Sequence, residues 1–277
     1  MATVTYIANN FKQPKGGFIK PSQFEKTILD DDKILNENEN LHASIVGLSV
    51  DYLTRFMMGT SIKKAFYISI LGYKNKIKYL GEEALKKDIE KKLNIKSLLE
   101  QIKGLDDESI ISACRAVTYD VWFRQSNAIA NNCKTSTEET IPDSETIENI
   151  RIMVNRSICF FDKYGKVEHD GFYFRDVDEK DNVIKNGYSK IVNAGDGDYL
   201  TKDTMWDFKV SKSEITNKHT LQLLMYWIMG KHSEIDMFKN IEKIGFFNPR
   251  LNKVYLLDMK DVSEDIIKQV ENEVICY

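Results

Sequence analysis

The stretch that decides the fold consists of two short runs, Gly195-Asp196-Gly197-Asp198-Tyr199-Leu200 and Met205-Trp206-Asp207-Phe208-Lys209-Val210. In the second run, apolar residues alternate with Asp207 and Lys209. Successive side chains of a β-strand point to opposite faces, so this alternation predicts a strand that carries the acid and the base on the same face.

The first run ends a β-rich segment, and the short polar link of residues 201–204 separates it from the second run. A link of this length predicts a hairpin, which brings Asp198 beside Asp207. Two neighbouring carboxylates raise each other's pKa unless a cation neutralises them. Because Mg²⁺ and Mn²⁺ prefer oxygen ligands, we expect the hairpin to hold one of these ions.

The segment His219–Tyr226 predicts a helix that is apolar over most of its surface. Its polar flank consists of His219, Gln222 and Tyr226. A mostly buried helix keeps polar side chains either to satisfy neighbouring backbone groups or to line a site. Because the hairpin precedes this helix, we favour the second interpretation, in which Gln222 and Tyr226 touch substrate or orient Lys209.

Together, Gly195-x-x-Asp198, Asp207-x-Lys209 and Gln222-x-x-x-Tyr226 resemble three motifs of the PD-(D/E)xK nuclease superfamily, in particular its RecB-type exonuclease branch. The resemblance implies an α/β fold with a restriction-endonuclease-like core, in which helices flank a mixed central sheet. It also implies a nuclease that depends on Mg²⁺ or Mn²⁺ and hydrolyses phosphodiester bonds in DNA, with RNA as the alternative substrate.

By the same resemblance, the catalytic residues are Asp198, Asp207 and Lys209. The two aspartates would hold the metal ion together with the carbonyl of Phe208. The substrate-binding candidates are Gln222, Tyr226, His219 and Lys212.

A further metal ligand has two candidates. Gly47-Leu48-Ser49-Val50-Asp51 is similar to the first motif of RecB-type nucleases, although Asp51 stands where that motif has a histidine. Aspartate is an acceptable ligand for a hard ion. The other candidate is Glu148, whose simpler interpretation is a solvated acid in the first turn of a helix. We favour Asp51.

Given the nuclease core that the resemblance implies, the pattern of the rest of the chain divides it into three segments. Residues 1–61 form the N-terminal part of the core, residues 62–143 a helical insertion, and residues 144–277 the part of the core with the motifs. Residues 3–8 predict a strand, and residues 23–30 a short helix. The lysine-rich segment 74–103 contains interspersed acids, so a solvated helix face is favoured over a track for nucleic acid.

Composition narrows the function classes. The chain has 277 residues and a formal net charge of −3, so contact with nucleic acid requires a local basic patch. It has neither an apolar run that spans a membrane nor the apolar part of a signal peptide, and we expect a cytoplasmic protein without a membrane partner.

The four cysteines show no metal-binding spacing. The abundance of Lys, Asn and Ile is typical of AT-rich bacterial or phage genomes.

Two function classes remain. The first is the nuclease; because no ATP-binding glycine loop is present, a helicase or a repair or defence partner would be a separate protein. The second is a catalytically inactive protein of the same fold that binds nucleic acid or protein. The presence of Asp198, Asp207 and Lys209 favours the enzyme.

Overall fold

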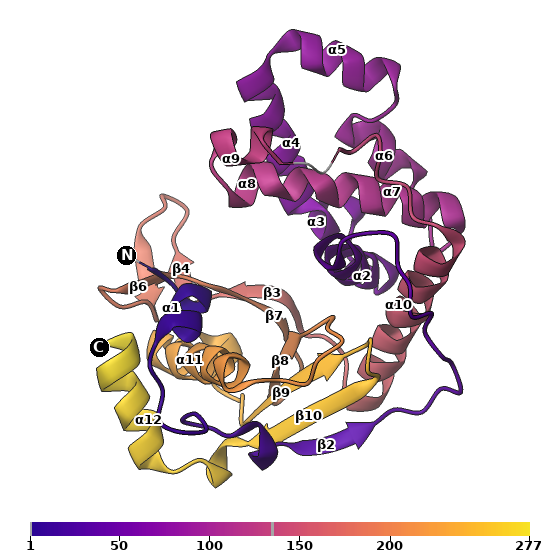
Figure 1. The fold of residues 1–277 in the computed structure, drawn as a ribbon. Coiled ribbons are helices and arrows are strands. Elements are labelled where there is room, and N and C mark those ends of the chain that lie inside the picture. Colours follow the sequence, from indigo (N-terminus) through magenta and orange to yellow (C-terminus); the bar gives the residue numbers. More distant parts are fainter. Residues whose placement is uncertain (1, 134–135) are drawn as a thin grey trace. The chain divides into compact units, whose positions relative to one another are not determined.

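The computed structural model describes residues 2–133 and 136–277, which divide into two compact units. The sheet unit contains the residues up to Leu29 and those from Phe160 to Tyr277, and the helical unit contains Asp30 to Cys159 (Figure 1). The division falls within one long helix, α10 (Ser144–Tyr164).

The sheet unit is built on a six-stranded sheet with the order β2-β10-β9-β8-β7-β3. The pair β8–β9 is parallel, and the other neighbouring strands are antiparallel. Helix α11 connects β8 with β9, as a parallel pair requires a crossover. The strands are β2 (Glu25–Ile28), β3 (His169–Tyr173), β7 (Asp196–Leu200), β8 (Thr204–Phe208), β9 (Lys243–Asn248) and β10 (Lys253–Asp258).

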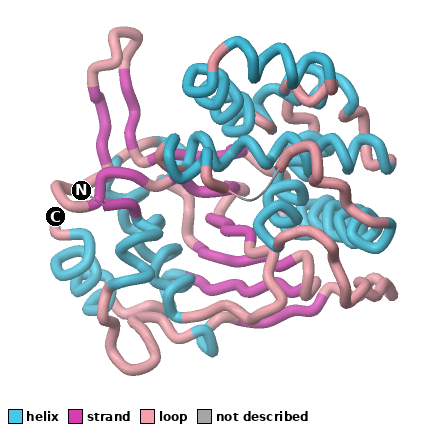
Figure 2. The backbone as a smooth tube through the Cα atoms, turned by 45° about the horizontal axis from the view of Figure 1, so that its top comes forward, coloured by secondary structure: helices cyan, strands magenta, loops and turns pink. Residues whose placement is uncertain are grey.

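Helices and short strands complete this unit. Strands β1 and β6 pair in parallel, and β4 and β5 form the antiparallel hairpin that Figure 2 shows as two magenta strands joined by a loop. The elements are β1 (Ala2–Thr3), α1 (Val4–Asn10), β4 (Arg175–Val177), β5 (Val183–Asn186), β6 (Val192–Ala194), α11 (Asn217–Ser233) and α12 (Glu264–Val270), with 3-10 helices at Pro21–Gln23, Asp236–Phe238 and Met259–Asp261 and a π-helix at Glu271–Ile275.

Both faces of the sheet are buried. On one face, Phe160 at the end of α10 stacks on Phe247, with ring centroids 4.3 Å apart, and meets Trp206 edge-on at 4.8 Å. On the other face, Met205 and Phe246 belong to the same apolar core as the buried side of α11. Because strand side chains alternate, Asp207 lies on the α11 face together with Met205.

The helical unit surrounds a buried carboxylate. Oδ2 of Asp120 accepts a hydrogen bond from the hydroxyl of Tyr52 at 2.5 Å, and its Oδ1 accepts one from Ser69 at 2.6 Å. These bonds tie α2 and α4 to the chain that follows α7. The helices are α2 (Ala43–Met57), α3 (Ile62–Ala65), α4 (Tyr67–Leu80), α5 (Glu82–Glu90), α6 (Ile95–Gln101), α7 (Asp107–Val117), α8 (Val121–Arg124), α9 (Asn127–Asn131) and most of α10, with a 3-10 helix at Thr118–Asp120.

The coarse expectation of an α/β protein with a mixed central sheet flanked by helices is confirmed. The helical unit is longer than the expected insertion of residues 62–143, because α2 and most of α10 belong to it. Residues 134 and 135 of that segment lie outside the described residues. Among the residues that the structure does describe, no helix combines the length and apolar character needed to cross a bilayer.

Two local predictions at the N-terminus are wrong. Residues 4–10 form helix α1 instead of a strand, because the hydroxyl of Thr3 caps it by accepting the amide of Tyr6 at 3.0 Å, and because Val4 and Ala8 pack into the core. Residues 25–28 form strand β2 instead of a helix, because β10 offers an edge to which they pair. At β2, tertiary pairing overrides the local propensity, whereas at α1 a local cap and tertiary packing act together.

Gly197 is required where β7 passes the side chain of its cross-strand neighbour Phe172. A Cβ atom at Gly197 would lie 1.9 Å from Cζ of Phe172. We therefore expect Gly197→Ala to destabilise the protein by about 1–3 kcal/mol through overpacking. The measurement is the urea midpoint of unfolding. Gly104→Ala is the control, since its nearest neighbour would be 4.0 Å away, and equal midpoints for the two variants would contradict this packing.

Candidate active site

Asp198 and Asp207 lie next to each other on the paired strands β7 and β8. The backbone pairing of these strands includes Tyr199 opposite Trp206. Beyond this pair, Oδ2 of Asp198 accepts a hydrogen bond from the amide of Phe208 at 2.8 Å. A side-chain oxygen therefore takes the place of a backbone carbonyl at this point of the strand pairing. The N–H and C=O of one strand residue point to the same side, which directs the carbonyl of Phe208 towards the Asp198 side of β8.

Asp207 forms a close ion pair with Lys209. Its Oδ2 lies 2.6 Å from Nζ of Lys209, and Asp207 is only 5% exposed. Apart from this ammonium, Oδ2 has no hydrogen-bond donor among the residues that the structure describes. A carboxylate oxygen has two lone pairs and can accept more than one partner. Asp207 therefore retains capacity to accept a further partner.

Lys209 keeps its positive charge in this setting. Burial by itself lowers the pKa of the ammonium, but the charges of Asp207 and Asp198 outweigh burial, and the pKa of Lys209 is raised above its usual value. The lysine is thus a fixed cation beside two carboxylates at neutral pH.

Gln222 links the hairpin to two helices. Its Oε1 accepts a hydrogen bond from Nζ of Lys209 at 3.3 Å, and its Nε2 donates to the hydroxyl of Tyr226 at 3.0 Å and to Oγ1 of Thr5 at 3.3 Å. Both donor positions of the amide face oxygen atoms, which leaves its carbonyl for the ammonium. The structure therefore brings together Lys209, Gln222 and Tyr226, as the sequence predicted.

The phenol of Tyr226 stays neutral. Burial raises the pKa of Tyr226, and the negative charges of Asp207, Asp196 and Asp198 raise it further. Close packing around the Tyr226 ring explains why residue 195, the first of the hairpin motif, is a glycine. A Cβ atom there would lie 2.8 Å from Val4 and 3.3 Å from the Tyr226 ring.

The other two substrate-binding candidates are His219 and Lys212. Nδ1 of His219 accepts the amide of Thr216 at 3.2 Å in a capping box that starts α11, so its first role is structural. Burial lowers the pKa of His219, and the charge of Lys209 lowers it further. Lys212 lies exposed in the loop between β8 and α11.

The two candidates for a further metal ligand belong to the helical unit. Asp51 on α2 is ion-paired with Nε of Arg55 at 2.9 Å, and Glu148 on α10 is ion-paired with Arg151. In the described part of the chain, no group of three or more His, Cys, Asp or Glu side chains is placed to hold a metal ion. The sheet unit itself offers two carboxylates and the Phe208 carbonyl, which are oxygen donors of the kind that Mg²⁺ and Mn²⁺ take.

Thr5 is the residue of this cluster that the sequence did not reveal. Residues 3–8 were expected to form a strand, and nothing in their pattern ties them to a helix more than 200 positions later in the chain. The helical spacing of Val4 and Ala8 was the available signal, since both pack into the core and place Thr5 beside α11.

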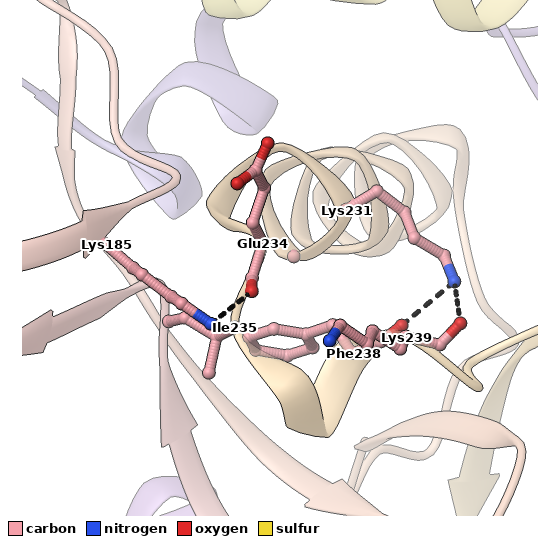
Figure 3. Close-up of a pocket in the computed structure, with 7 residues that line it drawn as sticks. Lys185, Lys231, Glu234, Ile235, Phe238 and Lys239 are labelled. Carbon is pink, nitrogen blue, oxygen red and sulfur yellow. Dashed lines mark hydrogen bonds between the residues drawn. The ribbon is translucent and has the colours of Figure 1, made fainter.

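A pocket of about 430 Å³ lies elsewhere in the sheet unit, at the C-terminal end of α11 (Figure 3). Two of its lysines bind backbone carbonyls: Nζ of Lys231 donates to Phe238 and Lys239 at 2.9 and 2.8 Å, and Nζ of Lys185 donates to Glu234 at 2.7 Å. Lys231 is nine residues from Gln222, about 14 Å along the helix at 1.5 Å per residue. The pocket therefore does not coincide with the carboxylate cluster.

Comparisons of the chain with protein-family models, with curated proteins and with solved structures found no match.

The pKa of His219 reports on the cluster without any assay of activity. We expect its NMR titration midpoint to lie below the usual value, because burial and Lys209 both oppose protonation. Lys209→Ala should raise the midpoint, since the charge of Lys209 lowers the pKa of His219 more than the charge of Lys218 does. Lys218→Ala, the matched control, should raise it less. An unchanged midpoint in Lys209→Ala would show that the lysine lies far from His219.

Proposed function

We propose that the protein is a metal-dependent nuclease that hydrolyses phosphodiester bonds in DNA. The observation that carries this proposal is the junction of Asp198, Asp207 and Lys209 on the α11 face of the sheet, with Gln222 bound to the lysine. The order of helix α10, antiparallel strands β3, β7 and β8, helix α11 and parallel strand β9 supports a restriction-endonuclease-like core.

A purely structural role explains this cluster less well. Moving a carboxylate and an ammonium out of water costs several kcal/mol for each ion, and their attraction offsets that cost only when further hydrogen bonds complete the pair. Oδ2 of Asp207 has no such bond among the described residues. A divalent cation at this oxygen would complete the site, which is why the geometry favours a metal-binding role.

The chain's own residues have separate tasks in the proposed reaction. Asp198, Asp207 and the Phe208 carbonyl would hold the ion, which when bound lowers the pKa of a coordinated water and stabilises charge on the phosphoryl oxygens. Lys209 places a positive charge where negative charge develops. Gln222 fixes the ammonium through its carbonyl, and the neutral phenol of Tyr226 fixes the orientation of Gln222.

We expect Asp207→Asn to abolish Mg²⁺-dependent cleavage of linear DNA. Loss of several kcal/mol of transition-state stabilisation corresponds to a decrease of about 100-fold or more. Asp203→Asn is the control, because Asp203 lies in the preceding turn and is ion-paired with Lys243 at 2.7 Å. The measurement is initial cleavage rate on linear, circular, single-stranded and RNA substrates with Mg²⁺, Mn²⁺ or EDTA. Equal rates for Asp207→Asn and Asp203→Asn would refute the site.

The further ligand is tested by calorimetric titration with Mn²⁺. If Asp51 is the ligand, as we propose, Asp51→Asn should weaken Mn²⁺ binding by about tenfold or more. Loss of a residue that only hydrogen-bonds to a metal ligand already has an effect of about this size. Glu148→Gln should leave the affinity unchanged. The reverse pattern would assign the ligand to α10, and two unchanged affinities would exclude both residues.

A further inference from the structure

In the helical unit, one stretch of the chain contains basic residues and no acidic ones. Between Asp51 and Glu82, residues 52–81 contain no acidic residue, although the whole protein carries a formal net charge of −3. The acids of the lysine-rich region begin only at Glu82, at the start of α5. The basic residues of this acid-free segment are Arg55, Lys63, Lys64, Lys74, Lys76 and Lys78.

Four of these lysines are available at the surface. Lys63 and Lys64 on α3, and Lys74 and Lys78 on α4, are exposed. Within residues 2–133 and 136–277, none of the four takes part in an ion pair or a hydrogen bond of its side chain. Lys76 differs, because it is partly buried and paired with Asp88 at 2.7 Å. The exposed lysines therefore form a positive strip that the described protein does not neutralise.

Exposed aromatic rings accompany this strip. Tyr67 is 54% exposed and lies 7 and 11 residues before Lys74 and Lys78, which places the three side chains on one face of α4. Tyr79, about 100° around α4 from Lys78, is 48% exposed, and its ring lies 5.8 Å from that of Trp122 at the start of α8.

The neighbouring helices α8 and α9 add apolar surface and no acid, whereas α5, which also contacts α4, begins with the exposed acids Glu82 and Glu83. α8 packs against α4, and the side chain of Asn75 donates to the carbonyl of Trp122 at 3.1 Å (Figure 1). Phe123 on α8 and Ile129 on α9 are 46% and 58% exposed. Residues 121–133 contain no acid, and the nearby Asp120 is buried and bound by Tyr52 and Ser69.

We propose that the surface of α3 and α4 that carries Lys63, Lys64, Tyr67, Lys74, Lys78 and Tyr79, called the α3–α4 strip, binds single-stranded nucleic acid. Lysines that lack protein partners attract the phosphates, and exposed rings stack on bases, which are free for stacking only in a single strand. A duplex would use the lysines and leave the rings without a partner. The proposal concerns binding by the helical unit and does not depend on cleavage by the sheet unit.

The test is fluorescence anisotropy of a labelled oligothymidylate with the full chain in EDTA, which separates binding from any metal-dependent cleavage. We expect wild-type protein to bind the single strand more tightly than a duplex of equal length. Replacing both Lys74 and Lys78 by Gln should lower the slope of log affinity against log salt by about 1.4, since each phosphate contact with a single strand contributes about 0.7. Tyr67→Ala should weaken binding by about fivefold or more with an unchanged slope.

The matched control replaces Lys86 and Lys96 by Gln. Both are exposed lysines of the same unit, but Lys86 lies among the acids of α5 and Lys96 is paired with Glu100. This control changes the net charge equally and should leave the slope unchanged. Equal effects of the two lysine pairs, tighter binding of the duplex, or binding to phosphatidylserine vesicles without binding to the oligonucleotide would each overturn the proposal. A protein that binds the strand and never cleaves it would refute the nuclease and retain the α3–α4 strip.

Discussion

The buried ion pair between Asp207 and Lys209 is the interaction around which the cluster in the sheet unit is arranged. Strand alternation places both residues on the face that α11 covers, so neither charge can be fully hydrated. The surrounding structure limits the free-energy cost of removing these charges from water in two ways. The charges of Asp207 and Asp198 hold the lysine in its protonated form, and Gln222 supplies an oxygen to the ammonium. The carboxylate has fewer partners, since Oδ2 of Asp207 contacts no donor other than this ammonium among the described residues.

The position of Gln222 depends on packing that lies outside the motif residues. Helix α11 is fixed by its buried apolar side and by the capping box of Thr216 and His219. Helix α1 brings Thr5 to the amide, and Gly195 leaves room for Val4 and Tyr226 to approach β7. The positions of Lys209, Gln222 and Tyr226 therefore depend on a glycine, a helix cap and an N-terminal helix. These supporting elements are not part of the proposed catalytic group.

The helical unit shows a second way in which charge is organised. An overall charge of −3 conceals a run of thirty residues without any acid, and the helix that follows it begins with Glu82 and Glu83. Carboxylates at the start of a helix are favoured by its dipole, so the acids of α5 have a local structural reason. The lysines of the α3–α4 strip have no comparable partner in the described protein, and exposed rings lie among them. Binding of a polyanion is the physical explanation that fits both features.

The mixed sheet between helices was expected from the family resemblance. By its side-chain pattern alone, the sequence determined the hairpin, the shared face of Asp207 and Lys209, and the helix of Gln222 and Tyr226. These features follow from side-chain periodicity and short links, which act over a few residues. Only the tertiary structure decided that residues 4–10 form a helix, that residues 25–28 pair with β10, and that Thr5 meets Gln222. It also decided that Asp207 is buried beneath α11 instead of facing solvent. Each of these outcomes depends on contacts between segments far apart in the chain, whose packing energy exceeds the weak local preference of either segment.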